Sequence, residues 1–105
     1  MADKKKWKTN GDGSVTITLA YPIQLKDKIV DSVTLRGEVT VEDLEVMDKG
    51  KGEVAKSIYM IAELSGLSPG VIRKMKSADF GAVADALAHV MGDEGNDPPK
   101  TGETS

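Results

Sequence analysis

The chain has 105 residues, with 14 basic and 17 acidic side chains, a formal net charge of −3, one histidine and no cysteine. A chain of this length can form only one hydrophobic core, which excludes the large enzyme folds. The absence of cysteine excludes disulfides and cysteine-based zinc sites, and His89 alone cannot form a histidine metal cluster. We therefore expect neither a metal nor a cofactor.

Charge and turn-forming residues divide the chain into three parts. Residues 1–13 begin with a basic run and residues 92–105 are rich in Gly, Pro and acids, so both are predicted to be disordered tails. Residues 14–91 are predicted to form a single domain. The longest apolar run, residues 58–62, is much shorter than the roughly 20 residues of a membrane span, and no secretory signal is visible. We expect a cytoplasmic protein that does not bind membranes.

The first half of the domain has the pattern of a β-hairpin. Apolar and polar residues alternate over 15–21, and after a turn at 26–28 the alternation resumes over 29–35. Because a two-stranded hairpin is only marginally stable in water, helices or a second subunit must cover its apolar face.

After Gly37 the apolar residues follow helical spacing. Thr40, Ser68 and Ser77 are the expected N-caps, and Asp79 lies in the first turn of the last helix, where the helix dipole favours a carboxylate. We predict four helices, over residues 40–48, 53–65, 69–74 and 78–91. The predicted fold class is α+β, an N-terminal β-hairpin followed by a small cluster of three to four helices.

The helix over 53–65 has apolar residues on two sides. Its core side carries Val54, Ile58, Ile61 and Ala62. Met60 and Leu64, four residues apart, project on the opposite side among polar residues. We interpret Met60 and Leu64 as contacts to a partner or a second subunit, with Lys56 and Glu63 as the polar rim. Alternatively, Leu64 packs under Leu67 and only Met60 is exposed.

A second hypothesis is a small helix-turn-helix regulator that binds DNA. The spacing of a small residue, a turn glycine and an apolar anchor is present at Ala62, Gly66 and Ile72. Cations follow at Arg73, Lys74 and Lys76. However, Pro69 and Gly70 occupy the positions from which bases are usually read, and the acidic net charge disfavours nucleic acid as a partner.

Two patterns associated with catalysis are incomplete. Residues 50–57 differ from a phosphate-binding loop at one position, because Ala55 stands where the second glycine belongs. Asp85 and His89 lie one helical turn apart, but no Ser or Cys nucleophile is spaced to complete a triad. We expect a protein that is not an enzyme.

Four passages carry a family resemblance through their order and spacing: TITLAYPI at 16–23, VTLRGEVTVEDL at 33–44, IAELSGLSP at 61–69 and SADF at 77–80. Together they resemble the tail assembly chaperones of contractile-tailed, Mu-like bacteriophages. The resemblance implies a non-enzymatic morphogenesis factor, encoded by a phage or prophage, that binds the tape-measure protein in the host cytoplasm. It also implies a longer, frameshifted form that contacts the tail tube protein. The two-sided helix and this resemblance together favour a homo-oligomer.

Overall fold

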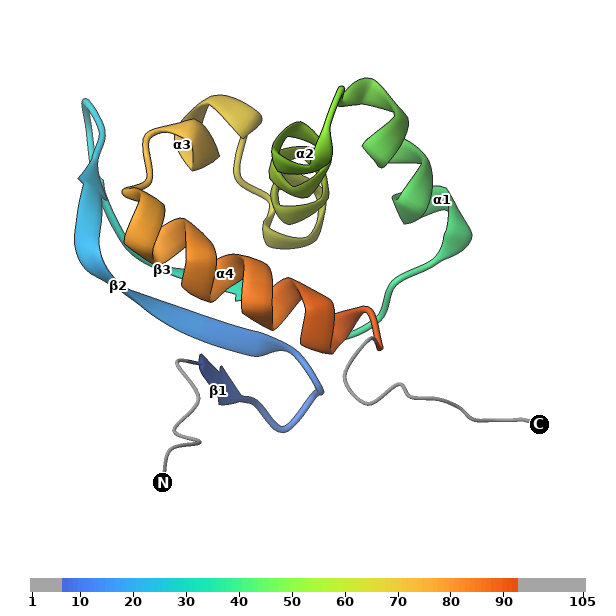
Figure 1. Cartoon of the computed structure of the whole chain (residues 1–105). Coiled ribbons are helices and arrows are strands. Elements are labelled where there is room, and N and C mark those ends of the chain that lie inside the picture. The colour runs from blue at the N-terminus through green and yellow to red at the C-terminus, as the bar shows by residue number, and fades with distance from the viewer. Residues whose placement is uncertain (1–6, 93–105) are drawn as a thin grey trace.

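Three strands and four α-helices follow one another in the computed structural model, which describes residues 7–92 (Figure 1). The strands are β1 (Trp7–Thr9), β2 (Val15–Gln24) and β3 (Ile29–Leu35). The helices are α1 (Val41–Leu44), the short 3₁₀ helix η1 (Glu45–Lys49), α2 (Glu53–Ser65), α3 (Pro69–Arg73) and α4 (Ser77–Val90). The prediction of an α+β fold is confirmed.

The strands form one antiparallel sheet in the order β1-β2-β3. Alternate side chains of β2 and β3, including Val15, Ile17 and Val33, are almost fully buried. Helix α4 contacts β2, and α2 contacts β3, so both helices cover the apolar face of the sheet (Figure 1). The predicted hairpin is therefore present, and helices of the same chain cover it.

Strand β1 corrects the prediction for the N-terminal region. Residues 7–9 were expected in a disordered tail, but they pair with β2 in a register that places Trp7 opposite Ile17 and Thr9 opposite Val15. The Trp7 ring also packs on His89 of α4, with ring centroids 5.6 Å apart. A strand this short gives no usable alternation in the sequence. Of the tails predicted at 1–13 and 92–105, residues 1–6 and 93–105 lie outside the described residues, and for them the prediction stays a prediction.

The predicted helices are present with local differences at their ends. The segment expected as one helix over 40–48 is divided into α1 and the 3₁₀ helix η1. Ser68 caps α3 as predicted, its side chain accepting a hydrogen bond from the N–H of Val71 at 3.2 Å. Ser77 is not a cap, because α4 already includes it and Lys76 occupies the N-cap position.

The start of α4 is held by a bond to the sheet. The ladder between β2 and β3 is interrupted by a bulge, in which residues 19–22 of β2 lie opposite Asp31 alone. Inside this bulge the Asp79 carboxylate accepts the N–H of Ala20 through Oδ1 and the N–H of Tyr21 through Oδ2, both at 2.9 Å. Asp79 is 5% exposed, so these charge-assisted bonds lie largely out of water. The Asp79 clamp, as we call this pair of bonds, joins α4 to the middle of β2.

Replacing Asp79 by Asn tests the Asp79 clamp. The amide of Asn presents one N–H₂ group to a backbone N–H donor, so we expect one of the two bonds to be lost and the other weakened. Hydrogen bonds to charged groups contribute about 1.5–3 kcal/mol, and we expect a loss of unfolding free energy of about that size. Urea unfolding followed by circular dichroism measures it. Asp85→Asn on the exposed side of α4 is the matched control, and equal stability of the two variants would contradict the clamp.

Candidate functional site

The side chains that the sequence placed at a partner interface are in the core. Met60 is 0% and Leu64 is 3% exposed, so the prediction that they project outward is wrong. Helix α2 is central: it contacts η1 and α1 on one side, α3 on another, and β3 and α4 below (Figure 1). Because five elements surround α2, both of its apolar sides are covered within one chain. Neither residue is available to a partner while the fold is intact.

The two polar residues expected as a rim have different surroundings. Lys56 is half-buried on α2. Glu63 is exposed near the end of α2, with its Oε2 atom 3.7 Å from Nη2 of Arg36. Glu63 therefore belongs to an ion-pair network within the chain.

The helix-turn-helix hypothesis gains no support from the geometry. The turn is present, with Gly66 in the left-handed conformation at φ 79° and Ile72 buried as the anchor. However, α3 spans only Pro69–Arg73, little more than one helical turn. A helix this short offers few side chains to the bases of a major groove.

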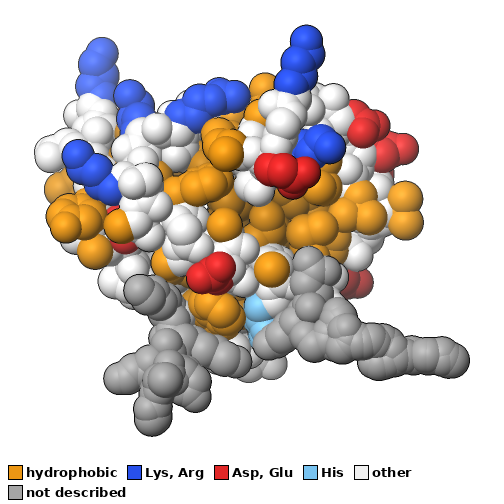
Figure 2. Space-filling model, in the orientation of Figure 1, with side chains coloured by type: hydrophobic (Ala, Val, Ile, Leu, Met, Phe, Trp, Pro, Cys, Tyr) orange, Lys and Arg blue, Asp and Glu red, His pale blue; other side chains and the backbone are white. Residues whose placement is uncertain are grey.

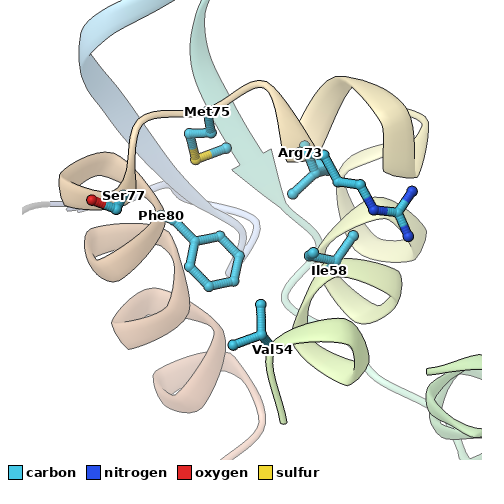
Figure 3. A pocket seen from close by; sticks show the side chains of 7 residues that line it. Val54, Ile58, Arg73, Met75, Ser77 and Phe80 are labelled. Carbon is cyan, nitrogen blue, oxygen red and sulfur yellow. The ribbon is translucent and has the colours of Figure 1, made fainter. Parts of the chain in front are cut away.

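An apolar groove opens between the first half of α2, α3 and the start of α4 (Figure 3). Its volume is about 210 Å³. It is lined by Val54, Ile58, Ile72, Arg73, Met75, Ser77 and Phe80. Figure 3 shows the Phe80 ring facing Val54 and Ile58 across the opening. Small-molecule sites are typically about 300–1,000 Å³, so this groove is better suited to one or two side chains of another protein.

The groove has an exposed apolar wall and charged residues at its rim. Val54 is 63% exposed although it lines the groove. Arg73 lies over the Tyr59 ring, 5.7 Å from its centroid, and exposed Lys74 and Lys76 flank Met75 in the chain. In Figure 2, apolar side chains gather in the middle of this face, with basic side chains along its upper and left edges and acidic side chains among and beside them. The groove therefore favours an apolar side chain, and both Arg73 and exposed Glu53, the residue before Val54, lie at it to contact polar groups of a partner.

Helix α1 carries a second exposed apolar surface, with acidic neighbours. Val41 is 76% exposed and Leu44 is 39% exposed, and the three-residue spacing places them on the same side of the helix. Exposed Glu42 and Glu45 lie beside them. We refer to Val41, Leu44, Glu42 and Glu45 as the α1 face.

An ion-pair network holds α1 in its orientation. Thr40 and Asp43 form a capping box, in which each side chain accepts the backbone N–H of the other residue. Arg36 donates from Nη1 to Oδ2 of Asp43 and from Nη2 to Oδ1, both at 3.1 Å. The N–H of Arg36 also donates to the carbonyl of Leu64 at 3.2 Å. Arg36 thus connects the end of β3 to the start of α1 and the end of α2.

The network lowers the pKa of Asp43. The two Arg36 hydrogen bonds are the largest cause, and the N–H of Thr40 adds to them, so the pKa of this carboxyl lies well below its usual range. Asp43 is 7% exposed, and because its pKa is lowered its carboxyl is ionised at neutral pH. Its role is structural.

Comparison with known proteins places the chain in a family. A sequence model of the family described as "Phage tail assembly chaperone proteins, E, or 41 or 14" matches residues 16–92, well over half of the chain. The chain belongs to this family of phage tail assembly chaperones. No curated protein and no solved structure matches it. The matched range covers β2 except for its first residue, all of β3 and the described helices, and the whole lining of the groove.

Residues 7–92 contain neither a candidate metal site nor a candidate membrane span. Within that range, no three His, Asp or Glu side chains come together in a way that could hold a metal ion. None of the helices described there is long and apolar enough to cross a bilayer.

The lowered pKa of Asp43 predicts how its contribution to stability depends on pH. Because the pKa is lower in the folded than in the unfolded state, the contribution is complete above about pH 4 and is lost as the pH falls toward the folded pKa. We expect Asp43→Asn to be less stable than the wild type at neutral pH, by a difference that shrinks below about pH 4. Urea unfolding at a series of pH values measures the difference.

The matched control for this measurement is Glu42→Gln, which removes an exposed carboxylate from the neighbouring position. Surface substitutions of this kind usually change stability little, so it should unfold like the wild type at neutral pH. A difference for Asp43→Asn that does not change between neutral and acidic pH would show that ionisation of Asp43 is not what stabilises the junction.

Proposed function

We propose that this tail assembly chaperone binds the tape-measure protein during tail morphogenesis, and that the apolar groove is the contact surface. Membership of the family supports a role in tail assembly. The observation that carries the proposal of a contact site is the groove itself, whose wall residue Val54 is 63% exposed. Exposed apolar walls with a polar rim are typical of surfaces that receive another protein.

The shape of the groove suits a helical segment. It runs between α2 and α4 and is open to solvent, so an amphipathic helix can lay one or two apolar side chains into it without threading. Met75 in the lining has an unbranched, polarizable side chain that adapts to different partners. Burying one aliphatic side chain contributes about 1.5–3 kcal/mol. Contacts of this strength can bind the tape-measure protein and still allow it to dissociate.

The activity proposed here is binding without catalysis, in the cytoplasm of the bacterial host. In this role the chaperone keeps an apolar helix of the tape-measure protein covered until tube subunits surround it. A longer form of the chain would present additional sequence to the tail tube protein.

Co-expression with fragments of a phage tape-measure protein tests the proposal. The wild type should keep at least one fragment soluble and co-purify with it, whereas Val54→Asp should retain less than about a tenth, since losing one apolar contact costs about 1.4 kcal/mol or more. The carboxylate lies in the first turn of α2, where the helix dipole tolerates it, so folding should be preserved.

Ile29→Ser is the matched control, because Ile29 is 58% exposed on the hairpin and lies outside the groove lining and the Asp79 clamp. It should retain the fragment as the wild type does. The proposed function fails if no fragment co-purifies with the wild type. The assignment of the groove fails if Val54→Asp folds and retains the fragment fully.

A further inference from the structure

A second cavity lies beside the groove on α2. Its volume is about 200 Å³, and its lining comes from η1, α2 and the segment that leads into α3. Tyr59 and Leu67 belong to this lining. Arg73 lines the groove, and its guanidinium lies over the Tyr59 ring, 5.7 Å from the centroid. The groove and the second cavity therefore meet at the pair formed by Arg73 and Tyr59.

We propose that the groove and the second cavity form one binding surface, which receives a helical segment with two apolar side chains that flank a carboxylate. One apolar side chain enters the groove, the other enters the second cavity, and the carboxylate pairs with Arg73. That the segment belongs to the tape-measure protein rests on the proposed function. The pattern of the segment rests on the two cavities and the cation between them.

Charge complementarity identifies the polar group of the segment. Arg73 is exposed, and within residues 7–92 no carboxylate forms an ion pair with it. Figure 3 shows its side chain directed away from Met75 and Phe80. The contact with the Tyr59 ring restrains the guanidinium, whose planar fork matches the two oxygens of a carboxylate. A carboxylate is therefore the group that this position recognises best.

The two acidic side chains beside these cavities do not neutralise Arg73. Glu63 lines the second cavity, but its Oε2 atom is 3.7 Å from Nη2 of Arg36, so its charge is offset within the chain. Glu53 precedes Tyr59 by six residues on α2, a rise of about 9 Å at 1.5 Å per residue. The positive charge of Arg73 is therefore the one presented where the two cavities meet.

The extent of the surface fits two turns of a bound helix. The α2 residues that line the cavities run from Val54 to Glu63, a rise of about 13.5 Å. In a bound helix, side chains seven residues apart share one side and are separated by about 10.5 Å along the axis. A residue three or four positions after the first lies between them on that side. The expected pattern is apolar at i, Asp or Glu at i+3 or i+4, and apolar at i+7.

Each cavity is of a size for one or two apolar side chains. The groove offers Val54 and Phe80 as walls, and the second cavity offers Val46 and Leu67, which are both half-buried. Burying a second aliphatic side chain strengthens binding by about tenfold or more. A segment that fills both cavities is therefore selected over one that fills the groove alone.

Substitutions in the second cavity and at Arg73 test the surface with a tape-measure fragment that the wild type retains. Leu67→Ser removes an apolar wall of the second cavity, and Arg73→Gln removes the charge between the cavities. Each should weaken binding of the fragment by about tenfold in isothermal titration calorimetry. Val46→Ser, in the η1 wall of the same cavity, gives the same test if Leu67→Ser does not fold.

Lys74→Gln is the matched control for the charge. Lys74 is an exposed cation next to Arg73 and lines neither cavity, so this variant should bind the fragment as the wild type does. An equal loss for Lys74→Gln and Arg73→Gln would show a general effect of charge and overturn the assignment of Arg73.

Charge reversal identifies the carboxylate of the segment. Arg73→Glu should weaken binding by at least about tenfold. Replacing the acidic residue between the two apolar positions of the fragment by Lys should restore binding to Arg73→Glu and weaken binding to the wild type. Such a restoration shows direct contact, because a substitution in the partner does not repair a damaged fold. If no acidic residue of the fragment gives it, the pairing with Arg73 is wrong.

Failure of this inference is distinct from failure of the proposed function. If Val54→Asp loses the fragment, but a folded Leu67→Ser or Arg73→Gln binds it as the wild type does, the two-cavity surface fails and the proposed function stands.

A model peptide decides the case in which the wild type binds no tape-measure fragment. The probe is an alanine-based helix with Leu at i and i+7 and Glu at i+4, and its control has Lys in place of Glu. If the Glu peptide shifts the amide signals of both Val54 and Leu67 in an NMR titration at lower concentration than the Lys peptide, the surface stands and the proposed function fails. If the two peptides do not differ, both fail.

Discussion

The Asp79 clamp is the contact on which the position of the groove depends. The bulge in β2 leaves the amides of Ala20 and Tyr21 outside the ladder with β3, and one buried carboxylate binds both. Phe80 follows Asp79 directly, so the bond that joins α4 to the sheet also sets the ring that faces α2. A defect in the regular pairing of two strands thereby becomes an anchor for a helix. The groove is a consequence of that anchor.

Arg36 positions the α1 face in the way that the Asp79 clamp positions the groove. One guanidinium binds the Asp43 carboxylate with both terminal nitrogens and reaches the carbonyls of Glu38 and Glu63 at 3.2 and 3.4 Å. Three elements that are separate in sequence, β3, α1 and α2, are joined at this side chain. The VTLRGEVTVEDL passage, which carries part of the family resemblance, contains both members of the pair. In this chain, that passage therefore encodes a structural junction.

Local sequence patterns predicted the helices and strands well, but they predicted poorly which elements contact one another. The range 53–65 was predicted correctly because Gly52 and Gly66 bound an uninterrupted helical pattern, and Ser68 acts as the expected cap. Asp79 was assigned to the helix dipole, because nothing in the sequence shows a bulge that lies 58 residues away from it. Burial of Met60 was missed for a related reason. A helical projection shows which residues share a side, but not how many elements surround the helix.

The short strand β1 has a consequence for the outer edge of the sheet. It covers β2 only over residues 15–17, and it is joined to the rest of the molecule through the Trp7 ring on His89. If β1 peels away, the backbone amides and carbonyls of that part of β2 become a template for a foreign strand, a common beginning of aggregation. Trp7 is the sole tryptophan of the chain, so its fluorescence directly reports whether this edge is closed.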